Sequence, residues 1–460
     1  MTEEDTAPGA RRRPADEEGA RERRAGGEGG MIPERVRAAA SRLPSLGPKL
    51  REVASALSLE IASAASLAVI FPLTIRGLGT DAYGEYTTIY VIAGFALTWV
   101  YAGGGAAAVQ LVMQRRRLTR SVMVVGRRQV TALAIPCGLV GIALTYAVLG
   151  GHLWLAAALL FGSDLLVGGI TEVNLALVFA HKGMGSIVRI RLIDPVVRAI
   201  GVGLLSVTGN ITILNLVLLN MGTRLILLGA SILAVRHLLD ERSDEEGEPT
   251  DRGEMARLSA LYSTSMSTNS VQNEGEKFLL ATFRPTSEVG EYNAAYRVVS
   301  AALIPLQAVY AVATRWFLPP DDRVGGHVRK SLLMTIPSLG FGIACAIGIV
   351  VGQPIIRWVL GEEFESAAHI TLWLAFVPLL HALAEIPPLG LLGLGENRRR
   401  MYLGVGAASA AIVVYLVLIP QLGWKGAVIG TYFSELVTIG GGWWMLVRCQ
   451  RRNDGASSLA

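Results

Sequence analysis

The densest run of side chains that could do chemistry lies in one stretch near the middle of the chain. It contains Ser263, Thr264, Ser265, Ser267, Thr268, Asn269, Ser270, Gln272, Asn273, Glu274, Glu276 and Lys277. A helix with so many polar groups must face water or protein rather than lipid. Lys277, and Arg297 in the next apolar stretch, are cations that can bind phosphate oxygens, Lys as a point charge and Arg in a bidentate way. We expect both, with the amides of Asn269 and Asn273, to bind a ligand in a polar cavity.

These charges also have a structural interpretation. Lys277 follows Glu274 by three residues, so the two could form an ion pair on one helix face. Glu276 would then need a base from another helix, and Arg297, at a similar depth in the next stretch, is the obvious partner. The residues alone leave both interpretations open, ligand binding and an ion-pair cluster.

The elements that must position these groups are membrane helices. Of the 460 residues 52% are hydrophobic and 17% charged, and the mean hydropathy is +0.45. The apolar residues form blocks of about 18 or more, the length that crosses a bilayer. This pattern excludes a soluble enzyme, a nucleic-acid-binding module and a disulfide scaffold. The isolated Cys137, Cys345 and Cys449 give no disulfide framework, and no cluster has the spacing of a metal site.

About twelve spans follow from a window of roughly 20 residues. They lie near 54–76, 85–112, 129–149, 153–180, 187–207, 211–236, 258–283, 292–318, 330–352, 368–393, 402–419 and 424–447. Lys and Arg cluster in alternate gaps, for example at Arg115–Arg117 and Arg398–Arg400, while the other gaps are short and poor in base. The positive-inside rule therefore predicts that both termini are cytoplasmic.

The expected organisation is two halves of six helices each. It comprises a disordered cytoplasmic tail over 1–53, a first lobe over 54–236, a cytoplasmic linker over 237–257, a second lobe over 258–450 and a cytoplasmic tail over 451–460. The first tail is too hydrophilic to bury a core. The halves are indicated by a repeat, because DAYGEYTTIY and SEVGEYNAAY share Gly-Glu-Tyr-x-x-x-Tyr 206 residues apart, each at the start of a second span.

The repeated motif has a local structural interpretation. Gly84 and Gly290 are expected to let the chain turn into the helix without Cβ strain. Tyr86 with Tyr90, and the equivalent pair of the second copy, stand at i,i+4 spacing and suit the aromatic belt at a membrane surface. The motif is therefore predicted to be structural, and its value is to mark the two halves.

The motif regions resemble oligosaccharide flippases and polysaccharide exporters of the multidrug/oligosaccharidyl-lipid/polysaccharide superfamily. In the first half the resemblance rests on Leu78, Gly79, Tyr83, Gly84 and Tyr86. In the second half it rests on Glu276, Lys277, Val289, Gly290, Tyr292, Ala295 and Arg297. Glu276 stands where the family more often has Asp. The resemblance covers about residues 54–450.

The resemblance implies a MATE-like all-α fold with two six-helix lobes around a central cavity, working by alternating access. The implied cargo is an isoprenoid-diphosphate-linked oligosaccharide or polysaccharide precursor that crosses the plasma (inner) membrane. The implied partners are membrane lipids and polysaccharide assembly proteins, not nucleic acid. A cation-coupled multidrug exporter is the alternative, although Lys277 and Arg297 favour anionic cargo. A membrane polymerase or glycosyltransferase is disfavoured by the short outer loops.

Directed transport needs an energy source, and the chain has no GxxxxGK[ST] nucleotide-binding loop. Acids inside spans are functional candidates by default. We therefore expect no enzyme chemistry and no cofactor other than a coupling H⁺ or Na⁺, carried by at least one of Glu60, Asp164, Glu172 and Glu276. Asp194 and Arg198 stand at i,i+4 spacing and are expected to pair with each other. Other ionisable residues within spans are Arg224, His381, Glu385 and Glu435.

Overall fold

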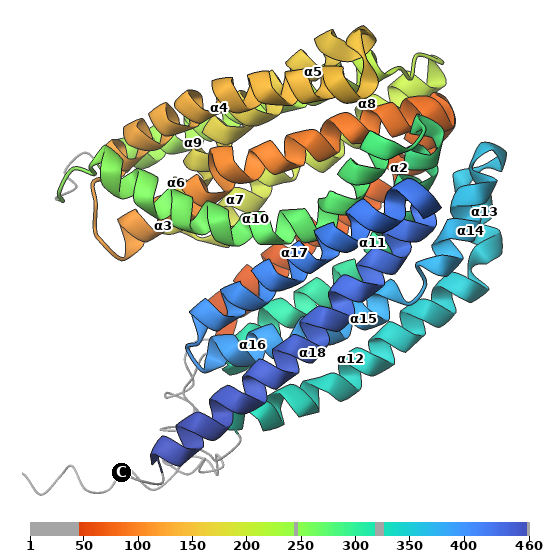
Figure 1. Cartoon of the computed structure of the whole chain (residues 1–460). Helices are drawn as coiled ribbons and strands as arrows, with labels where there is room; N and C mark the ends of the chain where they lie inside the picture. Colours follow the sequence, from red (N-terminus) through yellow and green to blue (C-terminus); the bar gives the residue numbers. More distant parts are fainter. Residues whose placement is uncertain (1–45, 243–246, 318–325, 458–460) are drawn as a thin grey trace, which may run out of the picture. The chain divides into compact units, whose positions relative to one another are not determined.

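A computed structural model describes residues 46–242, 247–317 and 326–457 of the chain. Residues 51–460 form one compact unit, and the account below concerns this unit. The tail predicted over 1–53 lies almost wholly outside the described residues. In the described residues every regular element is a helix, apart from a single bridge between Arg117 and Glu248 (Figure 1).

The helices follow the expected spans closely. In the first half they are α2 (Leu46–Leu97), η1 (Thr98–Ala102), α3 (Gly103–Met113), α4 (Thr119–Leu149), η2 (Gly151–Leu153), α5 (Trp154–Phe161), η3 (Gly162–Gly168), α6 (Gly169–Lys182), α7 (Met184–Arg191), α8 (Ile193–Val207) and α9 (Ile213–Glu241). In the second half they are α10 (Arg252–Phe283), α11 (Thr286–Phe317), α12 (Gly326–Val351), α13 (Gln353–Leu360), η4 (Glu362–Phe364), α14 (Glu365–Trp373), α15 (Val377–Ala384), α16 (Ile386–Gly393), α17 (Asn397–Leu422) and α18 (Trp424–Ser457). Each expected span falls on one helix or on consecutive helices.

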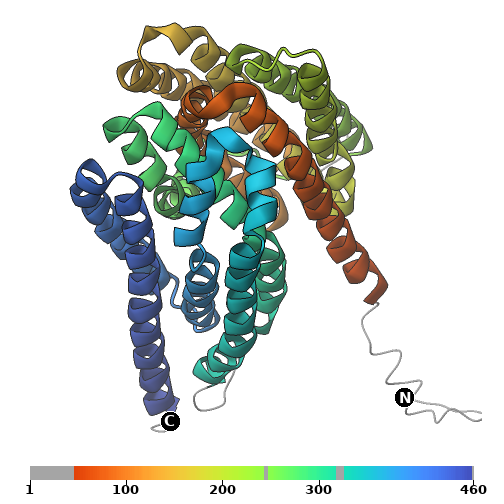
Figure 2. The same cartoon turned by 90° about the vertical axis from the view of Figure 1, so that its right-hand side faces the viewer.

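α2 contains the first hairpin, because the chain turns within it. Gly79 has φ 74° and ψ 177°, which is outside the helical region and is strained for any residue with a Cβ atom. The turn lies beside α13 and η4 (Figure 2). The Arg76 guanidinium carbon is 5.6 Å from the Trp358 ring centroid, and the rings of Tyr83 and Phe364 are 5.9 Å apart.

Six described helices are long and apolar enough to cross a membrane, or seven if the bent pair Glu362–Trp373 and Val377–Gly393 is one span. This count is below the expected twelve, and part of the difference has identifiable reasons. The segment Ser58–Met113 counts once although it turns back at Gly79. The span near 187–207 is interrupted at Leu192, and α10 carries the polar run described above.

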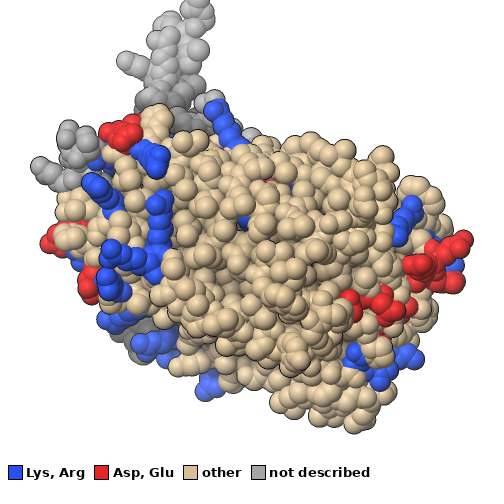
Figure 3. Space-filling model, turned by 90° about the horizontal axis from the view of Figure 1, so that it is seen from above, with Lys and Arg blue, Asp and Glu red and all other residues tan. Residues whose placement is uncertain are grey.

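The surface agrees with a membrane-spanning bundle. Figure 3 shows Lys, Arg, Asp and Glu gathered at two opposite sides of the visible face, with a broad band almost without charge between them. Large apolar side chains are exposed along the helices, for example Ile135 at 58%, Ile336 at 72% and Val413 at 62%. Such exposure is expected where lipid rather than water covers the protein.

α10 lies between helices of both halves. It packs against α3 on one side and α17 on the other (Figure 1). The approach to α3 is close, because a Cβ atom on Gly103 would lie 2.2 Å from Ser263 Oγ and 2.3 Å from the Ser259 carbonyl oxygen. Small residues permit such approaches in membrane proteins. The polar face predicted for this helix is therefore partly used in helix packing.

The start of α10 is tied to the loop between α3 and α4. Arg115 Nη1 is 2.6 Å from Glu254 Oε1, and Arg117 Nε is 3.2 Å from Glu254 Oε2. Arg117 also binds Glu248. The hydrogen bond from Arg115 holds the pKa of Glu254 below its usual range. The linker predicted over 237–257 is partly helical, since α9 continues to Glu241 and α10 begins at Arg252.

Candidate binding cavity

A cavity of about 710 Å³ lies between α2, α8, α9, α10, α11 and α15. Its charged lining residues are the cations Arg198, Lys277 and Arg297 and the acids Asp194 and Glu274. Serine, threonine, asparagine and tyrosine side chains line much of the rest. A cavity of this size and composition suits a polar small molecule or head group.

Lys277 fits both sequence interpretations. Its side chain is buried and borders the cavity, and Nζ is 3.0 Å from Glu274 Oε2, so the expected i,i+3 ion pair is present. The same Nζ lies 4.2 Å from the centroid of the Tyr296 ring. A cation held by a carboxylate and an aromatic face has a fixed position from which it can meet an anion.

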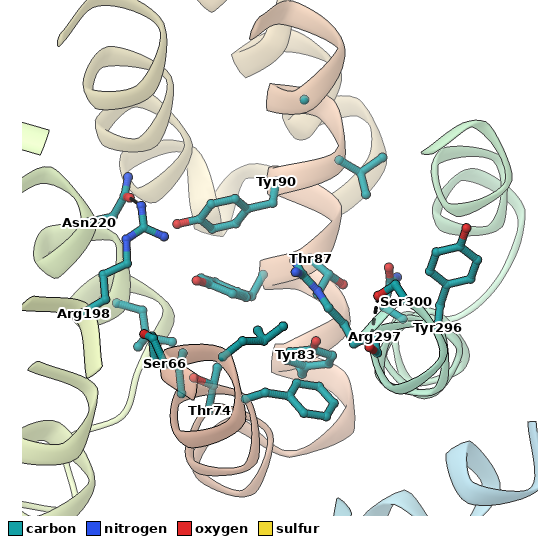
Figure 4. A pocket seen from close by; sticks show the side chains of 18 of the residues that line it. Ser66, Thr74, Tyr83, Thr87, Tyr90, Arg198, Asn220, Tyr296, Arg297 and Ser300 are labelled. Atoms are coloured by element: carbon teal, nitrogen blue, oxygen red, sulfur yellow. Dashed lines mark hydrogen bonds between the residues drawn. The ribbon is translucent and has the colours of Figure 1, made fainter. Parts of the chain in front are cut away.

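Arg297 is placed differently. It is exposed to the cavity and stands beside Tyr83 in Figure 4. In the described part of the chain it forms no ion pair, and the pairing with Glu276 considered above is not formed. The Glu276 side chain is 1% exposed, and neither carboxylate oxygen has a hydrogen-bond partner among the described residues. Arg297 therefore contributes an uncompensated positive charge to the cavity.

Arg198 is the cation that sequence reasoning did not assign to the cavity. The expected pair with Asp194 is present, with Arg198 Nε 3.0 Å from Asp194 Oδ1, and Arg198 also donates a hydrogen bond to Asn220 Oδ1 (Figure 4). Asn220 Nδ2 donates to Asp164 Oδ1 at 3.0 Å, and Arg224 Nε donates to the same oxygen at 2.8 Å. The i,i+4 spacing predicted the first contact, but only the fold shows that the pair faces the cavity.

The expected coupling acids differ in their surroundings. Asp164 lies in the π-helix η3 and is neutralised by Arg224 as described. Glu172 pairs with Arg191 at 2.6 Å. Glu60 is exposed on α2 and does not line the cavity. Of the four candidates, Glu276 is the buried one whose carboxylate has no hydrogen-bond or ion-pair partner in the described residues.

Three more residues named in the sequence analysis are Asn269, Asn273 and His381. The side chains of Asn269 and Asn273 lie outside the described part of the structure. His381 borders the cavity, and its Nδ1 is 2.9 Å from Glu435 Oε1, so the imidazole ring is held by this carboxylate. In the described residues no group of three or more His, Cys, Asp and Glu side chains could hold a metal ion.

The tyrosines of the repeated motif do not form an interfacial belt, and that interpretation is wrong. Tyr86 and Tyr90 line the cavity, as does Tyr296. Tyr292 is fully buried, with 0% exposure. The i,i+4 spacing correctly placed each pair on one helix face, but which neighbour the face meets depends on the tertiary packing.

The motif glycines also have a different role from the one expected. Neither has a positive φ, and the turn is made by Gly79 instead. A Cβ atom on Gly84 would lie 1.9 Å from the Thr286 carbonyl oxygen and 3.0 Å from Gly290 N. A Cβ atom on Gly290 would lie 2.2 Å from the Thr80 carbonyl oxygen. The two copies of the motif therefore cross backbone to backbone.

This crossing borders the cavity. Tyr83 and Asn293, which lie next to the crossing in the sequence, are lining residues. Thr286 Oγ1 donates a hydrogen bond to Asp81 Oδ1 at 3.0 Å across the same contact. We call this side of the bundle the motif end, and the contact of α2 with α11 lies there beside the cavity.

Comparison with known proteins gives three results. The model of a family described as polysaccharide biosynthesis protein matches residues 50–317. The search of curated proteins gave no match. Among solved structures, an inward-facing multidrug resistance MATE family transporter of the MOP superfamily superposes with a TM-score of 0.65, at 13% identity over 88% of this chain and 98% of the other.

Two further structures support the same fold. The outward-facing conformation of a multidrug resistance MATE family transporter gives a TM-score of 0.58 at 14% identity, covering 88% of this chain and 96% of the other. A MOP superfamily transporter from Pyrococcus furiosus, described as having a reversed polarity of its binding pocket, gives 0.56 at 13% identity, covering 86% and 96%. The chain thus has a MATE-like fold, and this fold implies about twelve membrane spans.

Proposed function

This chain belongs to the family of polysaccharide biosynthesis proteins, and from that premise we propose that it moves a lipid-linked glycan across the cytoplasmic membrane. The cargo is an oligosaccharide or polysaccharide precursor on an isoprenoid diphosphate. The protein moves it by alternating access, with both of its own termini in the cytoplasm. The motif end then faces outward, because the gaps beside it are the ones poor in Lys and Arg.

The charge of the cavity carries this proposal. Asp194 and Glu274, the two carboxylates of the lining, pair with Arg198 and Lys277. Arg297 is left with a positive charge that no carboxylate of the described residues balances. A diphosphate would supply that balance through charge-assisted hydrogen bonds from Arg297 and Lys277. Organic cations, the cargo of the alternative function, would meet a cavity of the wrong sign.

The test is a comparison of cargo classes in proteoliposomes. The purified protein is reconstituted, and movement across the bilayer is measured for a glycosylated polyprenyl diphosphate and for a fluorescent cationic dye. We expect the protein to move the diphosphate lipid and not the dye. Movement of the dye alone would establish the multidrug-exporter alternative instead.

Glu276 is the residue that we propose for coupling. Its carboxylate is buried without a hydrogen-bond partner in the described residues, which is a costly state for a charged group. The titratable and charged groups around it are Lys277, Glu274, Glu435, Tyr292, Tyr296 and Tyr415. Binding and release of a proton at this carboxylate would link its charge to the movement of the helices.

Replacing Glu276 by glutamine should remove the effect of a pH gradient on transport. We expect initial rates of the parent protein to rise when a gradient is imposed and those of Glu276→Gln to be the same with and without it. The matched control is Glu60→Gln, since Glu60 is exposed and outside the cavity lining. A gradient effect that survives in Glu276→Gln would rule out this assignment, and no effect in the parent would indicate downhill flipping.

A further inference from the structure

The side of the cavity formed by α2, α8 and α9 carries aromatic and polar side chains. Tyr83, Tyr86 and Tyr90 of α2 line the cavity there, and we call these three side chains the tyrosine face. The ring centroids of Tyr86 and Tyr90 are 4.7 Å apart, and those of Tyr83 and Tyr86 are 6.5 Å apart. The three rings follow one another along one side of α2, where Tyr86 and Tyr90 are half-buried and Tyr83 is buried.

Arg198 and Asn220 stand next to Tyr90 at one end of the tyrosine face (Figure 4). A guanidinium group has five N–H donors. Contacts to Asp194 and Asn220 hold the Arg198 group through Nε and Nη2. The group is thus held by one ion pair and one hydrogen bond, and it keeps other N–H donors for a ligand in the cavity that it lines.

Thr74 adds a buried hydroxyl group to the same surface. Its side chain is 4% exposed and lines the cavity. Its Oγ1 has no hydrogen-bond partner among the described residues. Because buried polar groups are almost always hydrogen-bonded, a ligand with hydroxyl groups would provide the partner that Thr74 lacks.

We propose that this surface is the sugar subsite of the cavity, where a pyranose ring next to the diphosphate stacks on the tyrosine face and bonds to Arg198 and Thr74, while Asn220 holds Arg198 in place. One face of a pyranose presents C–H groups, which fit the negative face of an aromatic ring. Its hydroxyl groups require donors and acceptors around the edge, and the Arg198 guanidinium and the Thr74 hydroxyl provide them. The subsite rests on the proposed function, because it places the sugar relative to the diphosphate.

The arrangement gives the ligand a direction. In Figure 4, Arg297 and Ser300 lie on one side, Arg198 and Asn220 on the other, with Tyr90 of the tyrosine face between them. A sugar that extends from a diphosphate at Arg297 therefore crosses the tyrosine rings before it reaches Arg198. Binding of the diphosphate at Arg297 gives an affinity that all diphosphate-linked lipids share. The side with Arg198 and the tyrosine face distinguishes one sugar from another.

The experiment compares two probes in proteoliposomes that contain the full chain. One probe is a polyprenyl diphosphate with a single glucose residue, and the other is the same lipid diphosphate without sugar. We expect Tyr86→Leu and Tyr90→Leu each to raise the half-saturating concentration of the glucosylated probe about three- to tenfold. The half-saturating concentration of the sugar-free probe should stay at the parent value. Tyr86→Phe, which keeps the ring, should remain close to the parent for both.

A second variant tests the polar end of the subsite. The double change Asp194→Asn with Arg198→Gln removes both charges of the pair together, so that no single charge is left uncompensated. It should raise the half-saturating concentration of the glucosylated probe and leave that of the sugar-free probe unchanged, as the tyrosine changes do. The control is Tyr146→Leu, because Tyr146 lies on α4 and is 62% exposed on the outside of the bundle.

The outcomes distinguish a failure of the proposed transport function from a failure of the sugar subsite. If the parent moves neither probe, the proposed function is wrong. If the parent moves both and the variants of the tyrosine face change both half-saturating concentrations equally or not at all, the sugar subsite alone is wrong. Elution of each variant as a single folded species confirms that the comparison concerns binding rather than folding.

Discussion

Gly84→Ala is expected to abolish most cargo transport while the amount of folded protein stays close to that of the parent. The added Cβ atom would lie 1.9 Å from the Thr286 carbonyl oxygen, and a backbone atom cannot rotate away as a side chain can. Overpacking of this kind costs about 1–3 kcal/mol, which would lower the population of the closed motif end roughly five- to hundredfold. Alanine favours the helix more than glycine does, so α2 itself should not be weakened.

Two measurements check this result. The first is the transport rate of Gly84→Ala and of Gly290→Ala, which should fall together because each Cβ atom meets the other motif. The second is labelling of Ser300→Cys in the cavity by an impermeant thiol reagent added from the motif end, after Cys137, Cys345 and Cys449 are replaced. Labelling should increase in the glycine variants.

The matched control is Gly229→Ala on α9, where no heavy atom lies within 4 Å of the added Cβ atom. It should transport at the parent rate. If Gly84→Ala transports and is labelled like the parent, the transport cycle does not need closure at the crossing of the two motifs.

Arg297→Ala is expected to raise the half-saturating cargo concentration about ten- to hundredfold. One hydrogen bond to a charged group contributes about 1.5–3 kcal/mol. Arg297 has no carboxylate partner in the described residues, so its removal leaves no buried charge behind. Arg297→Lys should recover part of the affinity, because the charge remains and the bidentate geometry is lost. Transport kinetics with the lipid-linked glycan give both values.

The controls distinguish cargo binding from a structural role. Arg128→Ala removes an exposed cation of α4 that does not line the cavity, and it should behave as the parent. If Arg297 acted by pairing with Glu276, Arg297→Ala would reduce the amount of folded protein and the further change Glu276→Ala would restore it. Normal transport by a well-expressed Arg297→Ala protein would eliminate the cargo-binding role.

Features that produce a local or periodic signal in the sequence could be predicted from it. Block length and the alternation of basic gaps placed every expected span on helices, and the repeat marked the two equivalent turns. The position of Lys277 and Arg297 on a cavity was also predicted from sequence, because a charge within an apolar span needs a polar cavity or a partner. These signals do not depend on how the helices face each other.

The roles of other cavity residues could not be predicted, because they depend on tertiary packing. Arg198 was assigned to a local pair with Asp194, which exists, but the same guanidinium also faces the cavity. Tyr86 and Tyr90 were assigned to the membrane surface because i,i+4 spacing defines a face without naming its neighbour. Gly84 was assigned to a turn, although the turn is at Gly79 and Gly84 is required by the approach of α11. A single sequence carries no signal that separates these alternatives.

The crossing of the two motifs has the geometry of an isologous interface folded into one chain. Thr80 and Gly84 meet Gly290 and Thr286 reciprocally, and each of these residues is offset from its counterpart by the repeat distance of 206. Two-fold contacts of this kind are the usual way in which identical subunits associate. A six-helix chain with one copy of the motif could make the same contact with a second copy of itself, so the geometry of the crossing does not require the two halves to be joined in one chain.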